Sequence, residues 1–247
     1  MRGKHQYFNF ERSLSRIHEI LNTTTSYEEA NDIPKRENLR FKNGKYVQCA
    51  SLFIDLRGSS DLIKTHKKQS KTLARLYRAY ISEMVAIVNS FKSCKEVNIV
   101  GDCVSAMFAG EQGDDKPVNE ALQAASMCNG MMHVLNIHFK KKWGAEFKHV
   151  KAGIGVALGR ALVIKAGHSG TGISDLVYMG DVVNTASKMC GLAAKKYTDP
   201  ICVTEDVYLN SNKYTLNFTL ESNDDYGYVY TGNFSERNLI KWIKANK

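Results

Sequence analysis

Two aspartates of this sequence follow segments that are typical of β-strands. Asp55 comes directly after the apolar residues 52–54, and Asp102 shares a tight turn with Gly101 between two further apolar segments. If these strands are neighbours in one sheet, the two carboxylates can hold Mg²⁺, which prefers oxygen ligands and completes its shell with water and substrate phosphates. Considered singly, Asp55 as a helix cap and Asp102 as a turn residue are simpler interpretations.

A small polar tract follows Asp55 and adds a second chemical feature. Gly58, Ser59 and Ser60 open a predicted helix. The first turn of a helix has free backbone N–H groups, and its dipole favours a bound anion. Metal ligands beside a phosphate-binding turn predict a site for a nucleoside triphosphate.

The hydrophobic pattern indicates which elements position these residues. Runs of strand length occur at 46–54, 97–100, 103–108, 150–156, 161–166, before Met179, at 201–204 and at 225–231. Helical spacing occurs at 14–21, over two helices broken near the lysines in 60–91, at 117–143 and from 181 to about 196. The strands 97–100 and 103–108 form a predicted hairpin with Asp102 at its tip, and a second hairpin is expected to turn at 158–160. This mixture predicts an α+β fold in which helices pack on a mostly antiparallel sheet.

The chain divides, by the same pattern, into a polar accessory arm at 1–45 with one short helix and a catalytic domain at 46–247. With 43% hydrophobic and 24% charged residues, the composition is that of a globular protein. We find no apolar run of spanning length and no signal peptide, so we expect a cytoplasmic protein without a membrane segment. The six scattered cysteines are expected to be reduced and mostly buried.

A net charge of +9 fits nucleic acid, an anionic membrane or an anionic small substrate. The dense clusters 64–78 and 140–142 lie in or beside predicted helices, so a solvated helix face is the simpler interpretation. No helix-turn-helix, zinc-finger or aromatic stacking pattern supports a nucleic-acid partner.

Four tracts occur in the order in which the class III nucleotidyl cyclase catalytic domain carries its motifs. They are FIDLRGSS at 53–60, IVGDCV at 99–104, KAGIGV at 151–156 and YMGDVVNTASK at 178–188. The sequence resembles that family over about 46–235, which implies its ferredoxin-like palm fold.

The resemblance implies a mechanism for the two aspartates. Asp55 and Asp102 match the ligands of two Mg²⁺ or Mn²⁺ ions, at which the ribose 3′-hydroxyl attacks the α-phosphorus and expels pyrophosphate. Asn184 matches an asparagine that orients the ribose. Lys188, one helical turn later, stands where the family usually has an arginine over the reacting phosphate, and a lysine there keeps the charge without the bidentate fork. Arg237 is matched more loosely with a further phosphate contact.

The family builds its site between two catalytic domains, with metal ligands from one and transition-state residues from the other. A chain that carries both sets is therefore expected to act as a head-to-tail homodimer with two equivalent sites, and to be inactive as a monomer.

The residues that read the base differ from those of the purine cyclases. Asn98 stands where adenylyl cyclases usually have lysine and guanylyl cyclases glutamate, and Val177 stands where a polar residue is usual. In this respect the sequence is most similar to the pyrimidine cyclases of bacterial Pycsar anti-phage defence, which make cyclic UMP or cyclic CMP for a separate effector protein. We favour UTP over CTP. An adenylate or guanylate cyclase, and a catalytically dead nucleotide-binding regulatory module, are the alternatives.

Overall fold

The computed structural model describes residues 5, 7–59, 62, 70–110, 117–145, 147–168, 173–195, 198–223 and 227–246. The chain forms two compact units. Unit 1 comprises Met1–Gln48 and Arg160–Gly180, and unit 2 comprises Cys49–Gly159 and Asp181–Lys247. The strands β2 and β5 run through both units. The sequence-based boundary at residue 45 stays a prediction.

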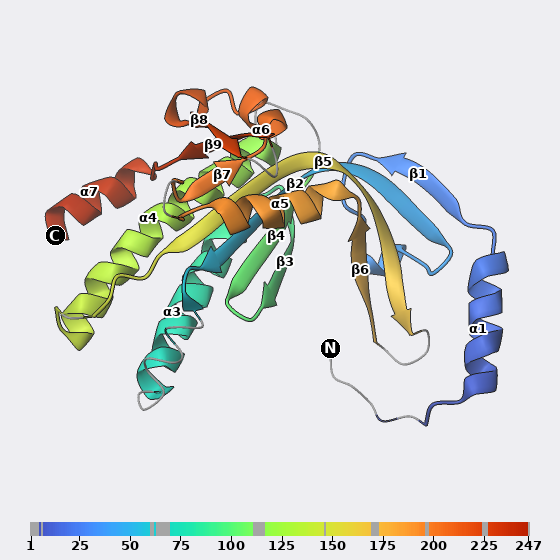
Figure 1. The fold of residues 1–247 in the computed structure, drawn as a ribbon. Coiled ribbons are helices and arrows are strands. Elements are labelled where there is room, and N and C mark those ends of the chain that lie inside the picture. Colours follow the sequence, from blue (N-terminus) through green and yellow to red (C-terminus); the bar gives the residue numbers. More distant parts are fainter. Residues whose placement is uncertain are drawn as a thin grey trace. The chain divides into compact units, whose positions relative to one another are not determined.

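Unit 1 contains the N-terminal helix and a set of paired strands (Figure 1). Its elements are α1 (Phe10–Asn22), β1 (Ser26–Ala30), the 3-10 helix η1 (Arg36–Asn38), the start of β2 (Asn43–Leu56), the end of β5 (Ala152–His168) and β6 (Ile173–Met179). The strand β1 pairs in parallel with β2, and β6 pairs antiparallel with β5. The predicted helix face at 14–21 lies on α1, which has no buried side chain.

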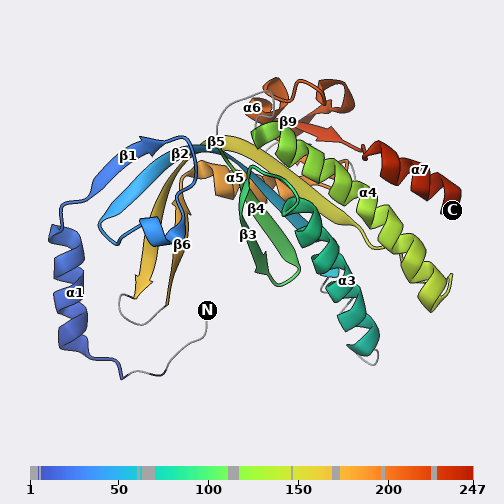
Figure 2. The same cartoon turned by 180° about the vertical axis from the view of Figure 1, so that it is seen from behind.

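Unit 2 contains a larger sheet and the remaining helices (Figures 1 and 2). Its further elements are α3 (Ser70–Val88), β3 (Cys94–Val100), β4 (Cys103–Phe108), α4 (Pro117–Trp143), α5 (Asp181–Leu192), β7 (Ile201–Val203), α6 (Glu205–Leu209), η3 (Thr215–Asn217), β8 (Thr219–Asn223), β9 (Gly227–Gly232) and α7 (Arg237–Asn246). The strand order is β3-β4-β2-β5-β7-β9-β8. Only β5 and β7 pair in parallel among the strand pairs described in this unit. The predicted α+β fold with a mostly antiparallel sheet is confirmed.

The two faces of the unit 2 sheet carry different helices, and β7 shows this residue by residue. Ile201 and Val203 belong to the large core with α3 and α4, whereas Cys202 belongs to a smaller core with Met189 of α5. Successive side chains of a strand point to opposite faces. Helix α5 therefore covers one face, and α3 and α4 cover the other, as Figures 1 and 2 show from opposite sides.

The predicted turn at 158–160 is wrong. β5 continues without a break from Ala152 to His168, and its antiparallel partner is β6, with Leu162 opposite Met179. Gly159 has another function. A Cβ built there would lie 3.2 Å from the Cβ of Val182, so the glycine makes room for the start of α5 rather than for a chain reversal.

Other predicted elements are confirmed with small shifts in their ends. The helix 117–143 has the predicted bounds, and the hairpin of β3 and β4 forms as expected. The predicted helix 181–196 ends at Leu192, and of the predicted helical segment 60–91 the structure describes α3 from Ser70. The elements α6, β8 and α7 were not predicted. Within the described ranges, no helix is both long and apolar enough to span a membrane. All six cysteines are free thiols, four of them buried, as predicted.

Candidate active site

The two predicted metal ligands lie on neighbouring strands of unit 2. Asp55 follows Ile54, which pairs with Val104 of β4, and Asp102 lies in the two-residue loop that joins β3 to β4. Gly101 has φ of 64°, as the first loop residue of a type II′ hairpin requires, so a side chain would be strained there. The hairpin thus places Asp102 beside the end of β2.

The two carboxylates are close enough for the charge of Asp102 to act on Asp55. Burial raises the pKa of Asp55 above its usual value, the charge of Asp102 raises it further, and the Arg57 guanidinium opposes both. The Oδ2 atom of Asp102 is buried and has no hydrogen-bond partner within the described ranges. A buried carboxylate oxygen is costly without a positive or donating partner. Both observations favour a cation at this position.

The chemistry of the donors fits a hard divalent cation. Within the described part of the chain, no three His, Cys, Asp or Glu side chains cluster as a closed metal site would require. Two carboxylates alone suit Mg²⁺ or Mn²⁺, which take their other ligands from water and substrate phosphates. Asp55 and Asp102 are the residues that would hold such an ion.

The structure describes the segment after Asp55 as far as Ser59, and again at Leu62. Gly58 has φ of 69°, and its carbonyl accepts a hydrogen bond of 2.9 Å from the N–H of Leu62, which closes a helical turn. Ser59 lies in this turn, while Ser60 lies outside the described residues. The phosphate-binding function of this turn stays a prediction.

Tyr77 of α3 also lies beside this site, a position that the sequence pattern did not predict. Burial raises the pKa of its phenol, and the charges of Asp102 and Asp55 raise it further. The hydroxyl is buried and has no hydrogen-bond partner among the described residues. In the sequence Tyr77 is one member of a helical apolar face. Tyr80 on the same helix also carries a phenol, so nothing in the sequence singles out Tyr77.

Asn184 and Lys188 lie on α5, four residues apart and both exposed. The backbone of α5 rests directly on β5 at Gly155. A Cβ built there would lie 2.0 Å from the amide nitrogen of Cys190 and 2.3 Å from the carbonyl oxygen of Ala186. The glycine therefore brings α5 close to the sheet, which fixes the height of Asn184 and Lys188 above it.

The two predicted base-reading residues belong to different units. Asn98 is exposed on β3 in unit 2, where it pairs with Ser105, and its Nδ2 donates a hydrogen bond of 3.1 Å to Oε1 of Glu96. Val177 lies on β6 in unit 1, opposite Ile164, and is 41% exposed.

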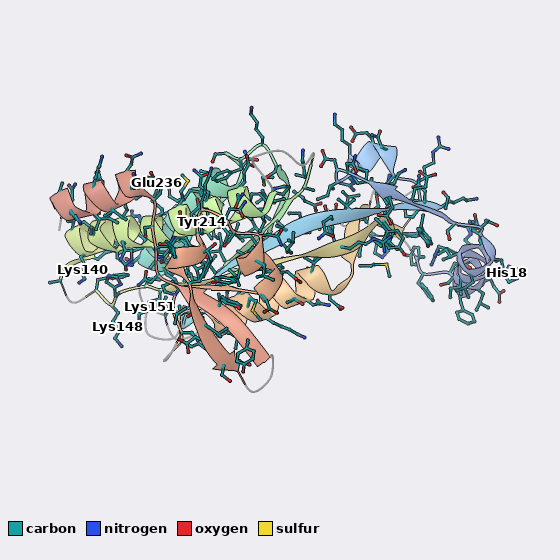
Figure 3. The ribbon with its side chains drawn as sticks, turned by 90° about the horizontal axis from the view of Figure 1, so that it is seen from above. His18, Lys140, Lys148, Lys151, Tyr214 and Glu236 are labelled. Atoms are coloured by element: carbon teal, nitrogen blue, oxygen red, sulfur yellow. The ribbon has the colours of Figure 1, made fainter. Side chains whose placement is uncertain are left out.

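Arg237 is the first residue of α7, whose Leu239 packs near Gly130 of α4. It therefore lies over the face of the unit 2 sheet opposite to α5. The carboxylate of Glu236, which Figure 3 labels, accepts hydrogen bonds of 2.7 and 3.3 Å from the N–H groups of Asn238 and Leu239. This acidic cap occupies the start of α7, so the helix itself adds nothing to a phosphate site. The phosphate contact of Arg237 stays a prediction.

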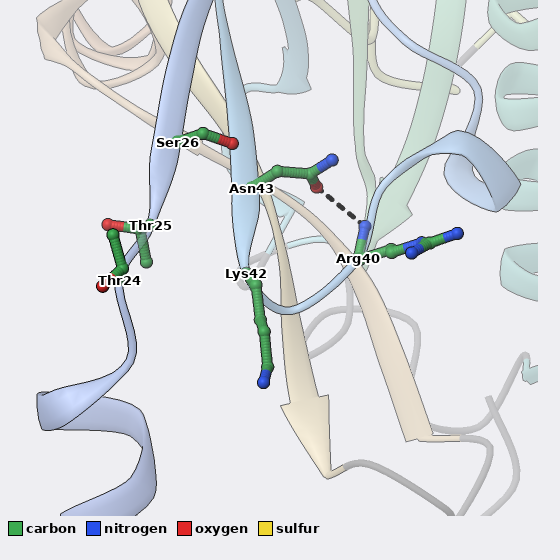
Figure 4. A pocket seen from close by; sticks show the side chains of 6 residues that line it. All are labelled: Thr24, Thr25, Ser26, Arg40, Lys42 and Asn43. Carbon is green, nitrogen blue, oxygen red and sulfur yellow. Dashed lines mark hydrogen bonds between the residues drawn. The ribbon is translucent and has the colours of Figure 1, made fainter.

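Unit 1 has a pocket of about 360 Å³, shown in Figure 4. Six residues line it: Thr24, Thr25, Ser26, Arg40, Lys42 and Asn43. None of the predicted site residues is among them. The pocket is therefore no part of the candidate active site.

Paired carboxylates at a hairpin, a glycine-led turn after β2 and a helix with Asn184 and Lys188 on a mostly antiparallel sheet define the class III nucleotidyl cyclase arrangement. The family described as "Adenylate and Guanylate cyclase catalytic domain" matches residues 41–233, and the chain belongs to it. Arg237 lies beyond the matched residues.

Among curated relatives, a protein of Gulbenkiania mobilis named uridylate cyclase is 63% identical over the whole of both chains. A uridylate cyclase of Treponema porcinum is 32% identical over 96% of this chain and 81% of its own. Among solved structures, the adenylyl cyclase CyaB from P. aeruginosa has a TM-score of 0.63 at 20% identity, covering 78% of this chain and 97% of its own. At that identity the likeness shows the fold alone.

Proposed function

We propose that this chain is a uridylate cyclase that converts UTP to 3′,5′-cyclic UMP and pyrophosphate. The observation that carries the proposal is the 63% identity, over the full length of both chains, to a protein named uridylate cyclase. The presence of Asp55, Asp102 and Asn184 favours a working enzyme over a dead nucleotide-binding module.

Each site residue has a separate role in the reaction. The 3′-oxygen of the ribose forms a bond to the α-phosphorus, and the bond from that phosphorus to the oxygen bridging to the β-phosphate breaks, so pyrophosphate leaves with the electron pair. Asp55 and Asp102 would hold the divalent ions, which when bound would supply positive charge for ionisation of the 3′-hydroxyl, its proton passing to water, and for the leaving phosphates. Asn184 orients the ribose by hydrogen bonding, and Lys188 places a positive charge over the reacting phosphate.

Asn98 and Val177 support a pyrimidine base. With one N–H held by Glu96, the amide of Asn98 keeps a second N–H and its carbonyl oxygen, which complement an acceptor and a donor on the edge of uracil. The edge of cytosine also offers a donor and an acceptor, so CTP is the second candidate substrate. Val177 gives no side-chain hydrogen bond of the kind that purine cyclases use.

Competition among the four nucleoside triphosphates at equal concentration, with Mn²⁺ and chromatographic identification of products, tests the substrate. We expect cyclic UMP to form at least about tenfold faster than cyclic AMP or cyclic GMP, a difference of about 1.4 kcal/mol in transition-state binding. Cyclic AMP or cyclic GMP as the main product would refute the pyrimidine assignment. Cyclic CMP in excess of cyclic UMP would show that CTP, rather than UTP, is the preferred substrate.

We propose further that the product signals to a separate effector protein in bacterial anti-phage defence. Cells that carry the cyclase and its effector should resist phage, and cells whose cyclase has Asp102→Ala should not. Equal protection by both forms would exclude a defence function that depends on cyclisation.

The active form is proposed to be a head-to-tail homodimer in which Asp55 and Asp102 of one chain meet Asn184 and Lys188 of the other. Mixing Asp55→Ala protein with Asn184→Ala protein should then restore activity, because a mixed dimer has one intact site. No recovery, with subunit exchange verified by mass spectrometry, would contradict the shared site.

A further inference from the structure

Arg57 belongs to the tract that follows β2, and its backbone is fixed to the neighbouring strand. Its N–H donates a hydrogen bond of 2.8 Å to the carbonyl of Lys151, just before β5. The side chain is only 18% exposed, and that of its partner Asp55 is 37% exposed. An arginine so buried needs partners for its charge, and the structure supplies them in two directions.

The first direction is toward the metal ligand. Nη1 of Arg57 lies 3.2 Å from Oδ2 of Asp55 and forms an ion pair with it. This contact holds one oxygen of the carboxylate and leaves the other for a cation. It also compensates part of the repulsion between Asp55 and Asp102.

The second direction is toward the C-terminal end of α5. Nε donates a hydrogen bond of 2.9 Å to the carbonyl of Ala193, and Nη2 donates to the carbonyl of Cys190. The last carbonyls of a helix have no partner within it and carry the negative end of its dipole, so a guanidinium stabilises them doubly. Both bonded carbonyls come after Lys188 in the chain, and Cys190 lies two residues beyond it on α5.

Gly153 of β5 provides the space in which the guanidinium lies. A Cβ built there would come within 1.7 Å of Nη2 and 2.4 Å of Cζ of Arg57. Any larger residue would therefore displace the guanidinium from both sets of partners. Because the far end of an arginine side chain can move, such a change displaces the group without requiring the backbone to shift.

We propose that Arg57 is a positioning residue of the cyclisation site, whose single guanidinium orients Asp55 and at the same time fixes the last turn of α5, the helix that carries Asn184 and Lys188. This inference rests on the proposed function, because its catalytic consequence depends on those roles. In the proposed homodimer one Arg57 orders residues of both active sites, the metal ligand of one and the transition-state helix of the other.

The first test compares Arg57→Lys and Gly153→Ala with Arg75→Lys, an exposed arginine of α3 that serves as the matched control. Arg57→Lys keeps the positive charge but loses the planar guanidinium, whose several N–H donors reach Asp55 and the end of α5 together. We expect amide hydrogen exchange over 189–194 to rise about tenfold in both test variants, and Mn²⁺ binding without nucleotide to weaken about threefold or more. The control should change neither. Unchanged exchange at the end of α5 in Arg57→Lys would overturn the proposal.

The second test is kinetic. Both test variants should lower kcat about tenfold while KM changes by less than about twofold, since positioning acts in the transition state. The double variant should be no worse than the more severe single one, because both changes remove the same contacts. Additive losses would show that Gly153 and Arg57 act separately and would contradict the argument.

The third test uses the mixed dimer of Asp55→Ala and Asn184→Ala chains, in which one site is intact. Arg57→Lys is added either to the chain that supplies Asp55 to that site or to the chain that supplies Asn184. We expect a loss of activity of about tenfold in both placements. If activity fell only when Arg57→Lys was in the chain that supplies Asp55, the proposed effect of Arg57 on Asn184 and Lys188 through α5 would be refuted. If the unaltered mixed dimer is inactive, the shared-site proposal fails, while hydrogen exchange and Mn²⁺ binding still decide the proposal for Arg57.

Discussion

Asp102 places a carboxylate oxygen in a buried position without a donor from the described residues, close to a second carboxylate. Such an arrangement costs folding free energy in the metal-free protein, and it is stabilising only when a cation binds. Asp102 is therefore a compromise in which local stability is reduced to create a binding site.

Asp102→Asn should eliminate cyclisation without lowering the stability of the metal-free protein. The substitution removes one charge from a repulsive pair and keeps the size of the side chain. Thermal unfolding with and without Mn²⁺ measures the effect, because a ligand that binds the folded state raises its stability. If the Asp102→Asn variant gained the same stability from Mn²⁺ as the unaltered protein, the metal assignment would be contradicted.

Lys188→Met should lower kcat about 100-fold, since removal of one transition-state contact typically has that effect. KM should change much less, because the contact is made mainly in the transition state. Lys188→Arg keeps the charge and should retain most activity. Steady-state kinetics separate these outcomes, and an unchanged kcat in Lys188→Met would remove this lysine from the site.

Three glycines of β5 determine how closely α5 approaches the sheet. Gly153, Gly155 and Gly159 lie on one strand, and an added Cβ at each would meet Arg57, the α5 backbone and Val182, respectively. The space that a side chain would fill at each glycine is thus occupied by a group from α5 or by Arg57, which binds the end of α5. The close approach of α5 to the sheet depends on these three positions.

Gly155→Ala should destabilise the protein by about 3 kcal/mol, because the added Cβ would meet the backbone of Cys190 and Ala186, which cannot move aside alone. Gly191→Ala is the matched control on α5, where an added Cβ meets nothing within 4 Å. It should stabilise the helix by up to about 1 kcal/mol. Urea unfolding gives both values, and equal stabilities of the two variants would contradict the close packing of α5 on β5.

At the scale of the whole molecule, the charge of +9 need not indicate a nucleic-acid partner. Lys140, Lys141 and Lys142 occupy the last turn of α4, where the helix dipole favours cations. Figure 3 labels Lys140 together with Lys148 and Lys151, at the same end of unit 2. Burial lowers the pKa of the nearby His149, and the charges of Lys140, His133 and Lys151 lower it further. This cluster fits the simpler interpretation of a solvated helix end.

Activity should depend on protein concentration in a way that follows dimer formation. If each site takes residues from two chains, activity per chain should rise steeply over the concentrations at which sedimentation velocity shows monomers becoming dimers. Lys140→Glu, which alters none of the predicted site residues, serves as a variant that should follow the same curve. Constant activity per chain in samples that are mostly monomeric would show that one chain holds a complete site.

Elements whose causes are local could be predicted from the sequence. Alternating and helical periodicities predicted the hairpin around Asp102 and the bounds of α4, since hydrophobic spacing and turn chemistry act between residues that are near neighbours along the chain. Asp55 could be placed at a strand end for the same reason. The family was indicated separately, by the resemblance of four sequence tracts in the order in which class III cyclases carry them.

Contacts between residues distant along the chain could not be predicted from the sequence and were found in the fold. Gly159 looked like a turn residue, but a glycine is needed there because Val182 of α5 packs against that position. Arg57 had no assigned role, because the carbonyl of Ala193 that it binds lies 136 residues further along the chain. Tyr77 packs against the core, as its place on a helical apolar face indicates, but only the fold brings its phenol within reach of the charge of Asp102. Close packing between remote segments leaves no periodic trace in the sequence, so these contacts became visible only in the folded chain.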